Sequence, residues 1–139
     1  MDPLVRQLVI RRAGNCCEYC RIAQALVPFR TFHVEHIVAR QHGGTDDPGN
    51  LCLACGRCNA YKGANLTAVD PDTDQVANLF HPRRHRWQEH FAFRGAEIVG
   101  LTATGRATIR LLKMNDYWRV VLRAELIALG DLPDHRAEE

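Results

Sequence analysis

The sequence contains no apolar run that approaches the roughly 20 residues needed to cross a bilayer. Its N-terminus, MDPLVRQLVIRRAG, interleaves arginines with apolar side chains and lacks a small-residue cleavage site, so we expect no signal peptide. Internal repeats and low-complexity linkers are missing as well. The lack of an apolar run long enough to span a membrane and of a signal peptide favours a cytoplasmic protein with no membrane partner.

The chain also has little excess of charge, with a formal net charge of +2 over 139 residues. Its 46% hydrophobic and 24% charged residues are typical of a soluble globular protein. This length suits one domain, and we predict a single domain over residues 1–139. Such a weak net charge permits a nucleic-acid partner without indicating one.

Cysteine is present in a pattern that predicts a metal site. Cys17 and Cys20 form one Cys-x-x-Cys pair, and Cys55 and Cys58 form a second. Two thiolates at this spacing can bind one ion, because the tight turn between them brings both sulfurs to one side. In a reducing compartment such pairs are more typical of metal ligands than of disulfides. A set of four thiolates leaves no open position for water, so we predict a structural zinc ion.

One alternative for the second pair stays open from spacing alone. Cys52, Cys55 and Cys58 are evenly spaced, so Cys52 and Cys55 also form a valid Cys-x-x-Cys pair. Cys16 has no partner at the required distance and is interpreted as a small buried thiol.

The hydrophobic patterns predict an α+β protein. Asp2 and Pro3 form a helix start signal, and the last helix is expected to pack through apolar residues that include Leu126 and Ile127 and to end at Gly130. Helices are predicted over residues 3–12, 56–64, 104–114 and 117–129, strands over 31–39, 51–54 and 96–101, and a hairpin over 67–80.

The most basic stretch is residues 81–87, HPRRHRW. Here Arg83, Arg84 and Arg86 suit contacts to a nucleic-acid backbone, with the tryptophan as packing support. The stretch equally suits a solvated helix start that residues 88–93 continue, and both interpretations stay open.

Between residues 31 and 63 lie a Glu-His dipeptide on an apolar run, a Gly-Gly loop, an Asn-Leu pair and a Cys-x-x-Cys that leads directly into an asparagine. With the upstream Cys-x-x-Cys, this pattern resembles the HNH endonuclease family, in the branch whose fold is pinned by a four-cysteine zinc site. The resemblance selects Cys55 and Cys58 as the second zinc pair. The matching positions are Cys17, Cys20, Glu35, His36, Gly43, Gly44, Asn50, Leu51, Cys55, Cys58, Asn59, Lys62 and Gly63.

The resemblance implies a ββα-metal core, in which a hairpin at about 31–54 precedes a helix from Gly56 and zinc braces the two ends. It places the HNH core at about residues 15–65, and a C-terminal extension with a further hairpin and helices at about 66–133. It also implies a metal-dependent endonuclease that uses Mg²⁺ or Mn²⁺ to hydrolyse phosphodiester bonds of DNA, leaving a 5′-phosphate and a 3′-hydroxyl.

The same resemblance implies the roles of four residues. His36 is the general base that activates water, a task suited to a side chain that titrates near neutral pH. Glu35 and Asn59 hold the divalent cation through hard oxygen ligands, and Asn50 fixes the loop that orients the histidine. The family often has an aspartate where this chain has the longer Glu35.

Geometry leaves further alternatives. On a regular strand Glu35 and His36 point to opposite faces, so they share a site only where the strand is twisted, bulged or ending. His33 lies on the face of Glu35 and is the alternative metal ligand. Arg57 and Lys62 on the short helix are candidate phosphate contacts. The alternative function is a non-catalytic zinc-braced DNA-binding module.

Overall fold

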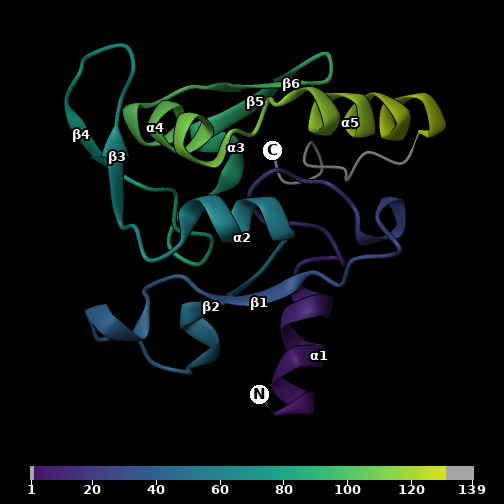
Figure 1. Ribbon diagram of the computed structural model, residues 1–139, viewed down its shortest axis with the longest axis vertical. Coiled ribbons are helices and arrows are strands. Elements are labelled where there is room, and N and C mark those ends of the chain that lie inside the picture. The colour runs from purple at the N-terminus through teal and green to yellow at the C-terminus, as the bar shows by residue number, and fades with distance from the viewer. Residues whose placement is uncertain (1, 131–139) are drawn as a thin grey trace.

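The computed structural model describes residues 2–130 (Figure 1). Within that part of the chain no helix has the length and apolarity that a membrane crossing requires. In chain order the elements are α1 (Pro3–Arg12), β1 (His33–His36), β2 (Leu51–Ala54), α2 (Gly56–Lys62), β3 (Thr67–Val69), β4 (Val76–Asn78), α3 (Trp87–His90), β5 (Phe91–Arg94), β6 (Glu97–Gly100), α4 (Ala103–Leu112) and α5 (Tyr117–Leu129).

The six strands of the described residues form three separate two-stranded antiparallel sheets, β1–β2, β3–β4 and β5–β6. The mixture of helices and small antiparallel sheets confirms the predicted α+β class. Figure 1 shows α2 between the β1–β2 hairpin and the C-terminal helices, and α2 packs on both hairpin strands and on α4.

Helix α1 has the predicted bounds because its end signals are local. The Asp2 carboxylate accepts a hydrogen bond from the backbone N–H of Leu4 at 2.8 Å, and Pro3 occupies the first helical turn. Gly14 and Asn15 then take positive φ angles of 64° and 55°, which a right-handed helix cannot continue.

Strand β1 is shorter than the predicted strand over residues 31–39, because it begins at His33 and ends at His36. Strand β2 has the predicted bounds. Its register pairs His33 with Ala54 and His36 with Leu51. Two residues later the backbone of Val38 pairs with the side-chain amide of an asparagine in place of a neighbouring strand. The chain therefore leaves the sheet directly after the predicted general base.

One hydrophobic core joins the zinc-ligand region to the C-terminal half of the described chain. Trp87 is 2% exposed, and its indole Nε1–H donates to the backbone carbonyl of Tyr19 at 2.9 Å. The rings of Phe80 and Phe91 pack edge to face at 5.1 Å. The tryptophan that closes the basic stretch is thus packing support, as predicted.

Residues 88–93 differ from the prediction that they continue a helix start. Helix α3 ends at His90, and the chain then enters β5, which pairs with β6 in the register Phe91 to Gly100. Burial of Phe91 in the shared core and the ladder with β6 favour a strand, and neither contact is visible from local sequence.

Helix α5 buries only part of the apolar set expected to pack, together with two arginines that were not predicted. Arg119, Arg123 and Leu126 are buried and lie at i, i+4 and i+7, while Ile127 and Leu129 are 44% and 63% exposed. Arginine stems can cover apolar surface, so the apolar residues alone did not identify Arg119 and Arg123 as part of the buried face.

Candidate active site and metal centre

Four cysteine sulfurs converge as the sequence predicts. The Sγ atoms of Cys17, Cys20, Cys55 and Cys58 lie within 4.8 Å of one another, and all four residues are buried. Cys20 Sγ and Cys55 Sγ are 3.7 Å apart. A tetrahedral zinc ion with Zn–S distances of about 2.3 Å separates its sulfurs by about 3.8 Å, so this donor set can hold zinc.

Each pair is shaped by the turn that carries it. The backbone N–H of Cys20 donates to Cys17 Sγ at 3.5 Å, and that of Cys58 donates to Cys55 Sγ at 3.4 Å. Cys55 is also the N-cap of α2, so the helix start places Cys58 in the first turn. Donation from backbone N–H groups at a helix start favours the thiolate form that zinc requires.

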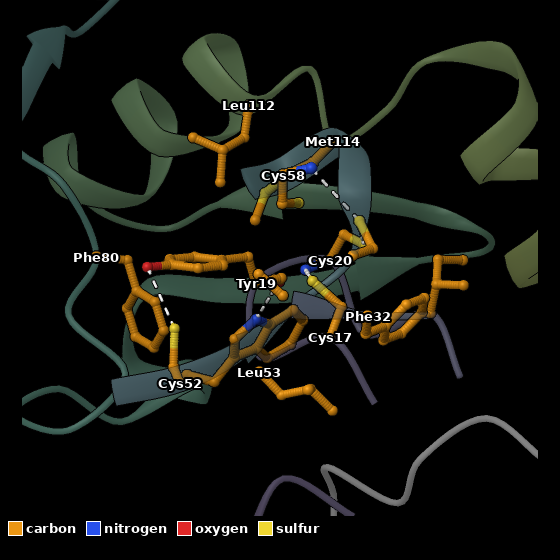
Figure 2. Close-up of a cluster of buried hydrophobic side chains, with 14 of the residues drawn as sticks. Cys17, Tyr19, Cys20, Phe32, Cys52, Leu53, Cys58, Phe80, Leu112 and Met114 are labelled. Atoms are coloured by element: carbon orange, nitrogen blue, oxygen red, sulfur yellow. Dashed lines mark hydrogen bonds between the residues drawn. The ribbon is translucent and has the colours of Figure 1, made fainter. Parts of the chain in front are cut away.

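Cys52 lies outside this set, which resolves the alternative pairing. Its thiol donates to Glu35 Oε2 at 3.3 Å and lies 3.7 Å from the hydroxyl oxygen of Tyr19. Burial, and then the charge of Glu35, raises the pKa of Cys52 well above its usual value, so it stays a neutral thiol. Figure 2 shows the Cys52 sulfur turned toward the Tyr19 hydroxyl. Cys16 is buried but also outside the set, as predicted.

Two buried arginines of α5 reach the cysteine cluster. Arg119 Nη1 donates to Cys58 Sγ at 2.9 Å, and Arg123 Nη1 donates to the carbonyl of Cys20 at 3.3 Å. Burial alone lowers the pKa of Arg119, but the thiols of Cys58 and Cys20 outweigh it, so the pKa lies above its usual value. Since zinc with four thiolates carries net negative charge, these cations offset a charge buried in the core. The sequence analysis missed both arginines.

A separate open cavity of about 430 Å³ lies where β1 ends. Glu35 and His36 from β1 line it together with Asn59 from α2. Three of the predicted catalytic residues therefore share one cavity. Glu35 and His36 are neighbours on β1, yet both line this cavity because β1 ends at His36. A strand end is one of the three conditions under which the two residues were expected to share a site.

Glu35 is only 6% exposed, so its carboxylate is a buried charge. Oε2 accepts the thiol of Cys52, while Oε1 lies 3.4 Å from Lys62 Nζ and makes no hydrogen bond. Burial raises the pKa of Glu35 above its usual value, and the charge of Lys62 opposes the shift. An unsatisfied carboxylate oxygen on a residue that shares this cavity with Asn59 fits the oxygen donors that Mg²⁺ or Mn²⁺ prefers.

The structure corrects the prediction for Lys62 and qualifies that for Arg57. Lys62 is 2% exposed, and its ammonium donates to the carbonyl of Ile37 at 2.9 Å, so it cannot contact a phosphate. Its role is to join α2 to the end of β1 and to face Glu35. Arg57 is on the surface, where Nη1 pairs with Asp116 Oδ2 at 2.7 Å; its contact with phosphate stays a prediction.

An aspartate that the sequence analysis missed holds His36. The Nε2 atom of His36 lies 2.7 Å from Asp46 Oδ1, and Arg40 Nη2 contacts both oxygens of Asp46 at 2.8 and 3.0 Å. The hydrogen bond with His36, followed by the charge of Arg40, lowers the pKa of Asp46 below its usual value. Asp46 therefore stays ionised at neutral pH. Its only signal in the sequence is its place in the turn-rich loop.

Asn50 fixes the loop between the two strands. Its Oδ1 accepts the N–H of Val38 at 2.9 Å, and its Nδ2 donates to the carbonyls of Val38 and Thr45 at 3.0 and 2.8 Å. A Cβ on Gly44 would lie 1.7 Å from the carbonyl oxygen of Val38, so only glycine fits there. This closed loop also carries Asp46, and the role of Asn50 in orienting His36 stays a prediction.

His33 lies elsewhere. Its Nε2 is at the start of α2, 3.9 Å from where a Cβ on Gly56 would lie, and it does not line the cavity of Glu35 and Asn59. A role for His33 as the alternative metal ligand stays a prediction.

Residues 17–65 match the HNH endonuclease family. The matched HNH segment begins at the first zinc cysteine and ends just after α2, so it contains both the cysteine cluster and the cavity of His36. No curated protein and no solved structure matches the chain. An HNH domain is typically a nuclease, and the match therefore implies a nucleic-acid partner.

Proposed function

We propose that the protein is a metal-dependent endonuclease that hydrolyses phosphodiester bonds of DNA. The observation that carries this proposal is the meeting of His36, Glu35 and Asn59 in one cavity, with the histidine held by Asp46. A nuclease needs a base for water and oxygen ligands for a cation within reach of one phosphate. The match of residues 17–65 to the HNH family supports the same reaction.

His36 acts as the general base. Because the Asp46 carboxylate accepts the proton of Nε2, the neutral imidazole carries its lone pair on Nδ1. Nδ1 then takes the proton from the attacking water, and Asp46 stabilises the imidazolium that forms. Arg40 restrains Asp46 through both oxygens, so the imidazole keeps its orientation.

Glu35 Oε1 and the amide oxygen of Asn59 are the proposed ligands of the divalent cation. When bound, the cation supplies positive charge that stabilises the developing charge on the phosphate and the leaving oxygen. The charge of Lys62 opposes the rise in the pKa of Glu35 that burial causes, and so favours the ionised form that a cation ligand requires.

A second candidate is the non-catalytic zinc-braced DNA-binding module. It is favoured by one observation: Glu35 already has a cation at 3.4 Å, the ammonium of Lys62. If that ion pair is purely structural, the cavity needs no divalent cation.

Metal dependence distinguishes the two functions. Supercoiled plasmid is incubated with purified zinc-loaded protein, with and without Mg²⁺ or Mn²⁺. We expect conversion to the relaxed or linear form only in the presence of the added cation, because the phosphate charge is otherwise uncompensated. Plasmid binding that is indifferent to the cation and leads to no cutting would favour the binding module.

Replacement of Asp46 by asparagine should lower the cutting rate about tenfold, because the amide no longer fixes the tautomer of His36. The rate constant for plasmid nicking is measured over a range of pH at saturating cation. Asp47→Asn is the matched control, since Asp47 is an exposed neighbour in the same loop. A purely structural role of Asp46 would leave the shape of the pH profile unchanged. Equal cutting rates for Asp46→Asn and Asp47→Asn would contradict the proposed pairing of Asp46 with His36.

A further inference from the structure

A second cavity, of about 560 Å³, lies between the end of α1, the first cysteine turn and the basic stretch. We call it the arginine cavity, because guanidinium groups from three separate segments line it. Its charged lining residues are Arg12, Glu18, Arg21, Arg83 and Arg86.

Positive charge exceeds negative charge in this lining. Glu18 is its sole carboxylate, and both oxygens are engaged: Oε1 accepts from Arg83, and Oε2 accepts the N–H of Leu53 at 2.8 Å. Arg83 Nε is buried and makes no hydrogen bond. Burial, and then the charge of Arg12, lowers the pKa of Arg83 to about 10, so the guanidinium groups repel one another. A bound anion would relieve this repulsion.

Aromatic residues of the cavity do not suit stacking with a base. Trp87 is 2% exposed, and the guanidinium carbon of Arg21 lies 4.9 Å from the centroid of its ring. Phe80 is also buried, at 3% exposure. The available chemistry is therefore that of N–H donors and positive charge, which suits phosphate groups better than nucleobases.

Backbone contacts connect the cavity to the hairpin that carries the proposed base. Arg12 Nη2 donates to the carbonyl of Leu51 at 2.7 Å, and Leu51 is the register partner of His36. Paired strands lie about 4.8 Å apart, so the guanidinium of Arg12 contacts the strand that neighbours the backbone of His36.

We propose that the arginine cavity binds backbone phosphates of the DNA substrate away from the bond that is cut. This inference rests on the proposed function and names a second contact surface for the same substrate. Arg83 and Arg86 line the cavity, whereas Arg84 is exposed and does not. We therefore expect Arg83 and Arg86, but not Arg84, to contribute to phosphate binding in the cavity.

The test is DNA binding by the zinc-loaded full chain, in buffer without added Mg²⁺ or Mn²⁺ so that cutting plays no part. A short fluorescein-labelled DNA duplex is titrated with the double variant Arg12→Gln/Arg86→Gln and with wild type, and anisotropy is followed over a range of salt. At about 0.1 M salt we expect roughly tenfold weaker binding and a salt slope smaller by about 2. Arg83 is left in place because Glu18 depends on it.

The matched control is Arg94→Gln/Arg110→Gln, which removes the same charge from two exposed arginines outside the cavity. This control should bind within about twofold of wild type, because diffuse charge contributes less than direct phosphate contacts. Equal losses in the two double variants, or no loss in either, would overturn the proposal.

Two further outcomes are decisive. If the Arg12→Gln/Arg86→Gln variant loses calorimetric binding of inorganic phosphate but retains its affinity for DNA, the cavity serves a small free anion and the proposal is wrong. A wild-type protein that does not bind the duplex would also overturn it. Metal-dependent plasmid cutting by the wild type would still support the proposed function in either case, so the two failures are distinguishable.

Discussion

His36→Ala is expected to abolish metal-dependent plasmid cutting while zinc content and thermal stability stay at wild-type values. A general base contributes about 10²- to 10⁴-fold to the rate, and among the described residues His36 is the only histidine that lines the cavity. The side chain of His36 is 24% exposed, so its truncation leaves no buried void to destabilise the fold. Nicking rates at saturating cation, zinc per chain and thermal unfolding are measured on both proteins.

The control for this substitution is His42→Ala, an exposed histidine in the loop after β1 that does not line the cavity. It should cut at the rate of the wild type. If His36→Ala cuts as fast as the wild type, then either the activity belongs to a contaminant or another group is the base. Loss of zinc together with activity would instead show that the variant had failed to fold.

Replacement of one zinc ligand should have the largest effect on stability. Cys20→Ser is expected to lose stoichiometric zinc and to unfold at a temperature lower by at least about 10 °C, because structural zinc binding contributes directly to folding. The effect should be large here, since the four sulfurs lie within the core that both halves of the described chain share. Zinc per chain and the thermal transition by circular dichroism are the measurements.

Cys52→Ser offers a closely matched control, because it makes the same chemical change at a buried cysteine beside the cluster. It should retain one zinc ion per chain, with at most a modest loss of stability from the altered contacts with Tyr19 and Glu35. Loss of zinc from this variant would contradict the ligand set. Removal of zinc from the wild type by a chelator should reproduce the Cys20→Ser result.

Features with local chemical signatures could be predicted from the sequence. The zinc set follows from two Cys-x-x-Cys pairs and the family pattern, and the structure confirms the choice of Cys55 and Cys58 over Cys52. Helix α1 and strand β2 have the predicted bounds, because caps and β-branched or apolar runs act within a few residues. The match to the HNH family covers the same stretch that carries these signatures.

The remainder depends on contacts that local patterns do not encode. Lys62 occupies a family position on a short helix, but periodicity alone cannot show that its stem passes inward to Ile37 and Glu35. Asp46 reaches His36 only because the loop closes back on β1. Arg119 meets its cysteine across 61 positions of sequence, where apolar patterning would place an arginine in solvent.

The two arginines of α5 have a consequence for the order of events during synthesis. All four sulfur ligands have been made once residue 58 has been added, whereas Arg119 follows Cys58 by 61 positions and Arg123 follows Cys20 by 103. A nascent chain therefore contains all four thiols before it contains the cations that surround them in the folded protein. The metal centre acquires its final electrostatic setting only after α5 has left the ribosome.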